Sequence, residues 1–158
     1  MLHRFMMFFL LAIFCTHIAA QKSIVKRQTK VYAVKDNVLN GNYRIYNAPL
    51  ISTECHRWGI TGIALSRQSV VLRKWCIPKE ARTYVWSSPN EFIEDAQTKR
   101  RFYIVKSDIG IGEDNMLYLD NSEQFMFGEW YPPLPSSVKV INIFNGSRYI
   151  IRNLQLNR

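Results

Sequence analysis

The stretch of sequence that decides the fold is residues 138–156, VKVINIFNGSRYIIRNLQL. Apolar and β-branched residues occupy both flanks of an Asn145–Gly146 step in its middle. An Asn–Gly step between two such flanks is the strongest short-range signal for a β-hairpin, because both residue types tolerate a positive φ. The pattern therefore predicts antiparallel strands at 138–144 and 149–156, joined by a tight turn at Asn145 and Gly146.

Similar short apolar runs, punctuated by turn residues, continue back from this hairpin to residue 29. The further strand candidates are residues 29–35, 43–46, 60–65, 70–77, 83–86, 92–94, 100–106, 116–119 and 124–131. No segment has a sustained 3.6-residue period, and the only helix candidate, 78–82, is one turn at most. We therefore expect an all-β fold, an antiparallel immunoglobulin-like β-sandwich of seven to eight strands after a cleaved signal peptide.

The first 20 residues have the layout of a secretory signal peptide. One basic side chain, Arg4, precedes an apolar run over residues 5–15, and the segment ends in Ala19 and Ala20. We expect a signal peptide at 1–20, an extended tail at 21–28 and a single β-sandwich domain at 29–158. Lipidation of Cys15 and a retained membrane anchor are the two alternatives. The expected location is the periplasm or cell surface, with the outer membrane as one site of association.

The charge balance is strongly basic. The chain has 21 Lys and Arg against 12 Asp and Glu; without residues 1–20, which hold one basic and no acidic side chain, 20 against 12 gives +8. Nucleic acid is a poor partner for an exported protein, so an anionic glycan, a lipid head group or an acidic protein face is favoured. The candidate binding residues in the densest runs are Lys22, Lys26, Arg27, Lys99, Arg100 and Arg101. The alternative is a solvated tail and a solvated turn.

Cysteine and histidine are scarce, which limits the chemistry. Beyond residue 20 the chain keeps only Cys55, Cys76 and His56. Two cysteines in an exported domain favour one disulfide, and the alternative is two free thiols with Cys76 as core filler. Cys55 and His56 are sequence neighbours, which point to opposite faces of a strand and make a poor nucleophile–base pair. Three N or S ligands are too few for a structural zinc site. We expect no enzyme activity, no metal and no cofactor.

Aromatic residues are abundant, with four Trp, nine Phe and eight Tyr. Trp130 and Tyr131, just before three prolines, are the first candidates for a sugar-stacking surface. Aromatic side chains in a sandwich more often serve as core or cross-strand partners, and this remains the alternative.

The order of segments in the second half of the chain is familiar. These segments are SVVLR at 69–73, TYVW at 83–86, FIEDAQTK at 92–99, RFYIVKSDIGI at 101–111, EWYPPLP at 129–135 and YIIRNLQL at 149–156. Together they resemble an exported β-sandwich module common in Bacteroidetes envelope proteins, where it occurs alone or ahead of thioredoxin-like domains. The resemblance covers about residues 69–156. It implies a binding or assembly module of the envelope, and the family has no catalytic residues to carry over.

These observations favour a non-catalytic exported binding or assembly module, an accessory subunit of a cell-envelope complex, with a membrane-embedded complex as one form of this partner. The tail at 21–28 would order on the partner or add a strand to its sheet. The alternative function is a glycan or lipid-head-group binding module that uses surface aromatics and basic residues. Burial of all four tryptophans would remove the stacking surface that this alternative needs.

Overall fold

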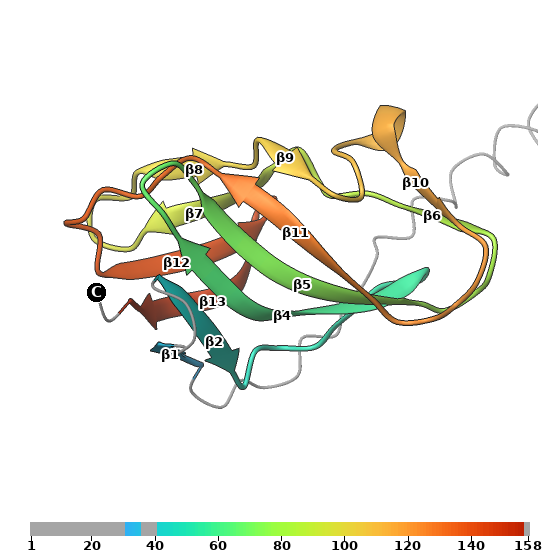
Figure 1. Cartoon of the computed structure of the whole chain (residues 1–158), viewed down its shortest axis with the longest axis horizontal. Helices are drawn as coiled ribbons and strands as arrows, with labels where there is room; N and C mark the ends of the chain where they lie inside the picture. Colours follow the sequence, from blue (N-terminus) through green and yellow to red (C-terminus); the bar gives the residue numbers. More distant parts are fainter. Residues whose placement is uncertain (1–30, 36–40, 157–158) are drawn as a thin grey trace, which may run out of the picture.

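The computed structural model describes residues 31–35 and 41–156 (Figure 1). The expected signal peptide, the expected tail and Cys15 lie outside these residues. Within the described part, thirteen β-strands are accompanied by a single 3₁₀ turn, η1 (Glu113–Asn115). In the same part, no helix has the length and apolar character needed to cross a membrane.

The strands occupy most of the expected segments, but β1 begins three residues later than expected, β4 begins four residues earlier, and β3 was not expected. The strands are β1 (Tyr32–Lys35), β2 (Asn42–Tyr46), β3 (Ile51–Ser52), β4 (His56–Leu65), β5 (Val70–Pro78), β6 (Thr83–Val85), β7 (Glu91–Asp95), β8 (Arg101–Tyr103), β9 (Lys106–Ser107), β10 (Leu117–Leu119), β11 (Phe125–Tyr131), β12 (Val140–Asn145) and β13 (Arg148–Gln155). Seven of the strands have five or more residues. The others are short, and the expected strand at 100–106 is divided into β8 and β9.

The strands form two main sheets and one small ribbon. A seven-stranded sheet has the order β1-β2-β4-β5-β11-β9, with β3 added on β4, and a four-stranded sheet has the order β13-β12-β7-β8. β6 and β10 pair in a two-stranded ribbon, which extends at one end of the molecule (Figure 1). All strand pairs are antiparallel. The all-β antiparallel sandwich is confirmed, while its immunoglobulin-like character stays a prediction.

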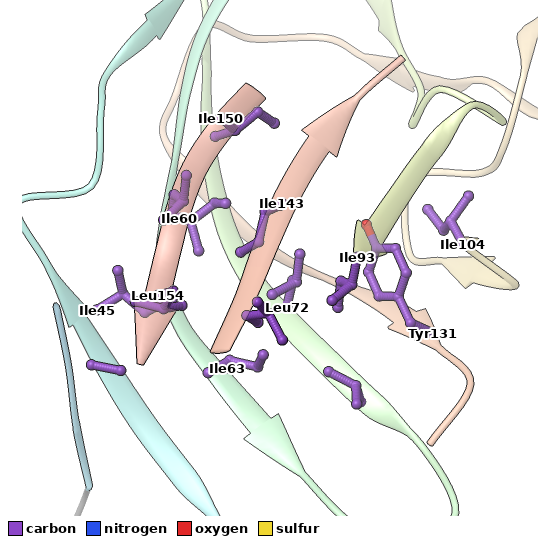
Figure 2. Packing of buried hydrophobic residues seen from close by; sticks show 14 of the residues in the cluster. Ile45, Ile60, Ile63, Leu72, Ile93, Ile104, Tyr131, Ile143, Ile150 and Leu154 are labelled. Atoms are coloured by element: carbon purple, nitrogen blue, oxygen red, sulfur yellow. The ribbon is translucent and has the colours of Figure 1, made fainter. Parts of the chain in front are cut away.

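The hydrophobic core lies between the two main sheets. Figure 2 shows Ile60, Ile63 and Leu72 of the larger sheet facing Ile93 and Ile143 of the smaller one. Alternation along each strand produces this arrangement, because residues two apart share one face of a sheet. Leu72, Ile93 and Ile143 have no solvent exposure. Each such side chain contributes about 1.5–3 kcal/mol of transfer free energy to folding.

The C-terminal hairpin forms as predicted, with its turn displaced by one residue. Asn145 pairs with Arg148 and ends β12, so the two loop residues are Gly146 and Ser147. Gly146 has φ 57°, as the first position of a type II′ turn requires, whereas Ser147 has no positive φ. The predicted helical turn at 78–82 is wrong: Pro78 still belongs to β5, and Arg82 has φ 59°.

Candidate functional site

A lysine lies on the inward face of the central strand of the larger sheet. The inward row of β5 contains Val70, Leu72, Lys74 and Cys76, and Lys74 is only 1% exposed. Its two neighbours in this row are apolar, so the ammonium group has to find its partners within the sandwich. A buried charge without a partner would cost several kcal/mol.

Two glutamates, one from each sheet, supply these partners. Lys74 Nζ lies 2.5 Å from Glu129 Oε2 of β11 and 2.5 Å from Glu91 Oε2 of β7. Both carboxylates are almost completely buried. Lys74, Glu91 and Glu129, called the Lys74 cluster below, therefore form a hydrogen-bonded polar bridge between the two sheets.

Neighbouring polar groups complete the hydrogen bonding of this cluster. Glu129 accepts hydrogen bonds from the hydroxyl of Ser87 at 2.7 Å and from the hydroxyl of Tyr131 at 2.8 Å. Glu91 Oε1 accepts longer bonds, both of 3.4 Å, from the backbone N–H of Ser88 and the side-chain amide of Asn145. Glu129 is the better satisfied of the two carboxylates.

The two glutamates therefore have opposite pKa shifts. Burial and the negative charge of Glu129 raise the pKa of Glu91 to about 8, although Lys74 opposes the shift. Burial also disfavours the charged form of Glu129, but Lys74 and the bonds from Ser87 and Tyr131 outweigh it and lower the pKa of Glu129. For Lys74, the attraction of Glu129 and Glu91 outweighs burial and raises the pKa. At neutral pH the cluster is a Lys⁺–Glu⁻ pair beside a protonated Glu91.

A cavity of about 320 Å³ adjoins the Lys74 cluster. Its lining consists of Cys55, His56, Trp58, Lys74, Cys76, Tyr84, Val85, Trp86, Ser87, Ser88, Glu91, Ile109, Phe127, Glu129 and Asn145. Trp58 is buried against the cluster, with Lys74 Nζ 4.6 Å from its ring centroid. Tyr84 and Trp86 are 50% and 38% exposed, so they stand at the mouth. The cavity combines aromatic walls with a polar floor.

His56 is one further polar group on the cavity wall. Its Nδ1 atom is buried and has no hydrogen-bond partner. Burial and the positive charge of Lys79 lower the pKa of His56, so the ring is neutral at neutral pH. A neutral imidazole nitrogen can donate or accept one hydrogen bond, but Nδ1 is buried away from the open space of the cavity.

The expected disulfide between Cys55 and Cys76 is absent, and both thiols are free. Strand register explains this. Cys55 lies level with Lys79, whose N–H donates to its carbonyl, whereas Cys76 pairs with Trp58. The two cysteines are thus three positions apart along the strands, about 10 Å. A disulfide requires Cα atoms within about 7 Å. Cys76 is core filler, the alternative expected from the sequence.

The two thiols are expected to differ sharply in reactivity. Cys55 is exposed, whereas Cys76 is buried and burial raises the pKa of its thiol to about 11. Since the thiolate is the nucleophile and burial also blocks the reagent, Cys76 should react with DTNB roughly 100-fold more slowly than Cys55. Ellman kinetics on Cys55→Ser and Cys76→Ser variants, both in a Cys15→Ser background, measure this. Equal rates in the folded protein would contradict the placement of Cys76.

The candidate binding residues do not come together in one place. Tyr131 is completely buried and donates to Glu129, so its expected role in an exposed stacking surface with Trp130 is wrong. Trp130 points to the opposite face of β11, where Lys106 Nζ lies 4.8 Å from its ring centroid. The physical reason is the two-residue period of a strand, which sends neighbouring side chains to opposite faces.

The candidate residues of the two basic runs do not gather on one surface either. Lys99 and Arg101 lie near Glu94, at 3.8 Å and 3.7 Å, on the outer face of the four-stranded sheet. Arg100 instead lies against Phe102, 5.1 Å from its ring centroid. Lys22, Lys26 and Arg27 lie outside the described residues. Among the described residues, no group of three His, Cys, Asp or Glu side chains is placed to hold a metal ion.

Sequence analysis missed the Lys74 cluster, although a signal for it was present. In the segment Val70–Cys76, residues 70, 72 and 76 are apolar, so Lys74 is the one charged residue in a period-two apolar row. Glu129 occupies the same position between Phe127 and Tyr131. A charge within an apolar row of each of two adjacent strands points to a buried ion pair.

The position of Lys74 bears on what the two glutamates can do. Its ammonium group is 2.5 Å from an oxygen of each, so it fills the space between the carboxyls. Hydrolysis by a pair of carboxyls requires the glycosidic bond of the substrate to lie between them, in the space that Lys74 Nζ fills. The arrangement therefore favours binding of a ligand in the adjoining cavity over cleavage of a ligand between the two carboxyls.

Comparison with known proteins provides no relative: no family model, no curated protein and no solved structure matches this chain.

Proposed function

We propose that the domain is a non-catalytic, exported binding module that takes a neutral hydroxylated ring compound, a sugar residue of a glycan, into the cavity beside the Lys74 cluster. The observation that carries the proposal is the meeting of aromatic walls and buried polar groups in one partly open cavity. Small-molecule sites have this composition, with mostly apolar linings and a few convergent polar groups.

The size and charge of the cavity favour a neutral sugar. Its volume of about 320 Å³ is near the lower end of the range of roughly 300–1,000 Å³ for ligand pockets, enough for one or two small rings. The cluster has no net charge when Glu91 is protonated, so neither an anion nor a cation is strongly preferred. The Glu91 carboxyl and the Asn145 amide supply donors and acceptors for hydroxyl groups.

The aromatic residues at the mouth provide the other half of sugar recognition. The apolar face of a sugar ring packs against an exposed indole or phenol ring, and Trp86 and Tyr84 present such rings. Only Trp58 among the four tryptophans is buried. The stacking surface that the glycan hypothesis requires is therefore available.

The accessory-subunit hypothesis rests on export and on the tail at 21–28, which lies outside the described residues. A sugar-binding cavity is compatible with it, because an envelope complex can use such a module to hold a glycan. Export and envelope location remain part of the proposal.

Replacement of Trp86 by alanine is expected to weaken glycan binding about tenfold, since one stacking contact contributes about 1–1.5 kcal/mol. The wild-type protein is first screened on an array of neutral glycans, and the best oligosaccharide is then titrated by calorimetry. Trp130→Ala is the matched control, because Trp130 lies on the outer face of β11. Equal losses in both variants, or no neutral glycan bound at millimolar concentration, would refute the proposal.

A further inference from the structure

A row of aromatic side chains crosses the outer face of the four-stranded sheet. It consists of Tyr103 on β8, Phe92 on β7, Phe144 on β12 and Tyr149 on β13, called the ring ladder below. Each ring is directly opposite the next in the strand register. The core residues Ile93 and Ile143 point the other way, into the space between the sheets (Figure 2).

The rings of this ladder pack against one another. Ring centroids are 5.3 Å apart for Tyr103–Phe92, 4.4 Å for Phe92–Phe144 and 4.0 Å for Phe144–Tyr149. Phe92 and Phe144 are nearly parallel, at 19°, and are only 5% and 6% exposed. The faces of the central rings are therefore occupied by neighbouring rings, and the ladder is a rigid support.

An arginine lies against the ladder near each end. The Cζ atom of Arg101 is 4.7 Å from the centroid of Phe92, and that of Arg152 is 3.8 Å from the centroid of Tyr149. Stacking on a ring restrains a guanidinium group and leaves its N–H edge for carboxylate, sulfate or phosphate groups. Part of the Arg101 edge already faces Glu94 and Tyr103, so a ligand anion uses its remaining N–H groups. The two rings that carry the arginines, Phe92 and Tyr149, lie on either side of Phe144, with ring centroids 4.4 Å and 4.0 Å from it. A chain with repeated anionic groups can therefore pair with both arginines at once.

The surroundings add positive charge and a shallow groove. Lys99 lies near Arg101, and the single carboxylate between them, Glu94, also accepts a hydrogen bond from Asn142. The carboxylate of Glu94 therefore neutralises only one of the three positive charges of Lys99, Arg101 and Arg152. A groove of about 460 Å³ opens on the ladder itself, and its lining consists of Asn90, Phe92, Arg101, Tyr103, Phe144, Gly146 and Ser147.

We propose that this outer face binds a linear anionic glycan, whose sulfate or carboxylate groups pair with Arg101 and Arg152 across the ring ladder. The site is separate from the cavity at the Lys74 cluster and does not depend on the function proposed for it. The excess of basic over acidic residues in the chain complements such a ligand.

The occupied ring faces favour a glycan over single-stranded nucleic acid. Proteins that bind single strands offer exposed aromatic faces on which bases stack. In the ring ladder the faces of Phe92 and Phe144 are covered, and Tyr103 and Tyr149, 48% and 37% exposed, each pack against a neighbouring ring, so the ladder offers no continuous platform for successive bases. An anionic glycan supplies anionic groups for the two arginines without needing a stacking partner.

The test measures binding of a size-defined heparin oligosaccharide by the full chain, with thermal melting to confirm folding of every variant. Arg101→Ala/Arg152→Ala should weaken binding by roughly tenfold or more, because two charge-assisted contacts are lost. Arg67→Ala/Arg73→Ala, two exposed arginines of the β4–β5 hairpin, removes the same charge and should change binding less than about threefold. Arg101→Lys/Arg152→Lys should also weaken binding, since lysine keeps the charge and loses the planar fork.

Several results would overturn this proposal. These are failure of the wild-type protein to bind the oligosaccharide, equal losses in the two alanine pairs, and full binding by the lysine pair. Equally tight binding of a charge-matched oligothymidylate, or of vesicles with anionic lipid, through the same two arginines would show a general polyanion or membrane site instead. Trp86→Ala should leave heparin binding unchanged, which separates this site from the cavity.

Discussion

Replacement of Lys74 by alanine is expected to lower the free energy of unfolding by about 3–5 kcal/mol, the usual cost of removing one partner from a buried ion pair. Without the ammonium group, Glu129 and Glu91 lie close together in the sandwich with no cation between them. Glu129, the ionised one of the two at pH 7, must then take up a proton or admit water. The loss of the aliphatic part of Lys74 adds a cavity next to Trp58.

Urea unfolding at pH 7, followed by tryptophan fluorescence, measures this loss. Lys106→Ala is the control, because Lys106 is an exposed lysine that also lies against a tryptophan ring, and it should cost less than about 1 kcal/mol. The triple variant Lys74→Met/Glu91→Gln/Glu129→Gln removes all three charges and should be more stable than Lys74→Ala. A Lys74→Ala variant as stable as the Lys106→Ala control would show that the Lys74 cluster does not hold the sheets together.

Strand positions were predictable from the sequence because local alternation and turn residues determine them. The segment 70–77 alternates around a consistent inward row, and β5 forms there as Val70–Pro78. The Asn145–Gly146 step marked the hairpin, but the turn uses Gly146 and Ser147, since a single glycine at the first loop position satisfies a type II′ turn.

Register irregularities were not predictable from the same pattern. β13 carries extra residues at two register shifts against β12, and Asn153 has φ 52° within that strand. As a result both Ile150 and Ile151 are buried, although neighbours in a regular strand point to opposite faces. A bulge depends on the packing of the whole sheet, and residues 149–156 alone carry no signal for it.

The candidate sites depend on contacts between strands that are distant in sequence. Lys74, Glu91 and Glu129 come from three strands in two sheets, and the ring ladder also needs four strands in a fixed order. Sequence analysis had no means of pairing these strands. It named single members, such as Arg101, as candidate binding residues, but it did not place them beside Phe92.

The stability of the protein is expected to fall by about 2 kcal/mol between pH 6.5 and pH 9, because Glu91 loses its proton in this range. The folded pKa of Glu91, about 8, is higher than its ordinary value of 4.5. A raised folded pKa means that the folded state holds a proton that the unfolded state has released. The stabilisation is complete below pH 4.5, decreases by about 1.4 kcal/mol per pH unit above it, and is lost once pH passes 8.

The other groups with shifted pKa values change the stability of the protein mainly outside the range from pH 6.5 to pH 9. The lowered pKa of Glu129 makes its contribution decline only as pH falls below 4.5, and the raised pKa of Lys74 matters only above pH 10. His56, with a lowered pKa, costs stability only below about its ordinary value of 6.5. The raised pKa of Cys76, about 11, becomes important only above its ordinary value of 9. The slope between pH 6.5 and pH 9 therefore belongs to Glu91.

Urea unfolding at half-unit pH steps tests this assignment with a matched pair of variants. Glu91→Gln mimics the protonated carboxyl, so its free energy of unfolding should be nearly constant from pH 6.5 to pH 9. Glu94→Gln changes a buried glutamate three positions along, on the other face of the same sheet, and should keep the wild-type slope. A slope that survives in Glu91→Gln would mean that another group releases the proton, and that the carboxyl beside Lys74 is already ionised at neutral pH.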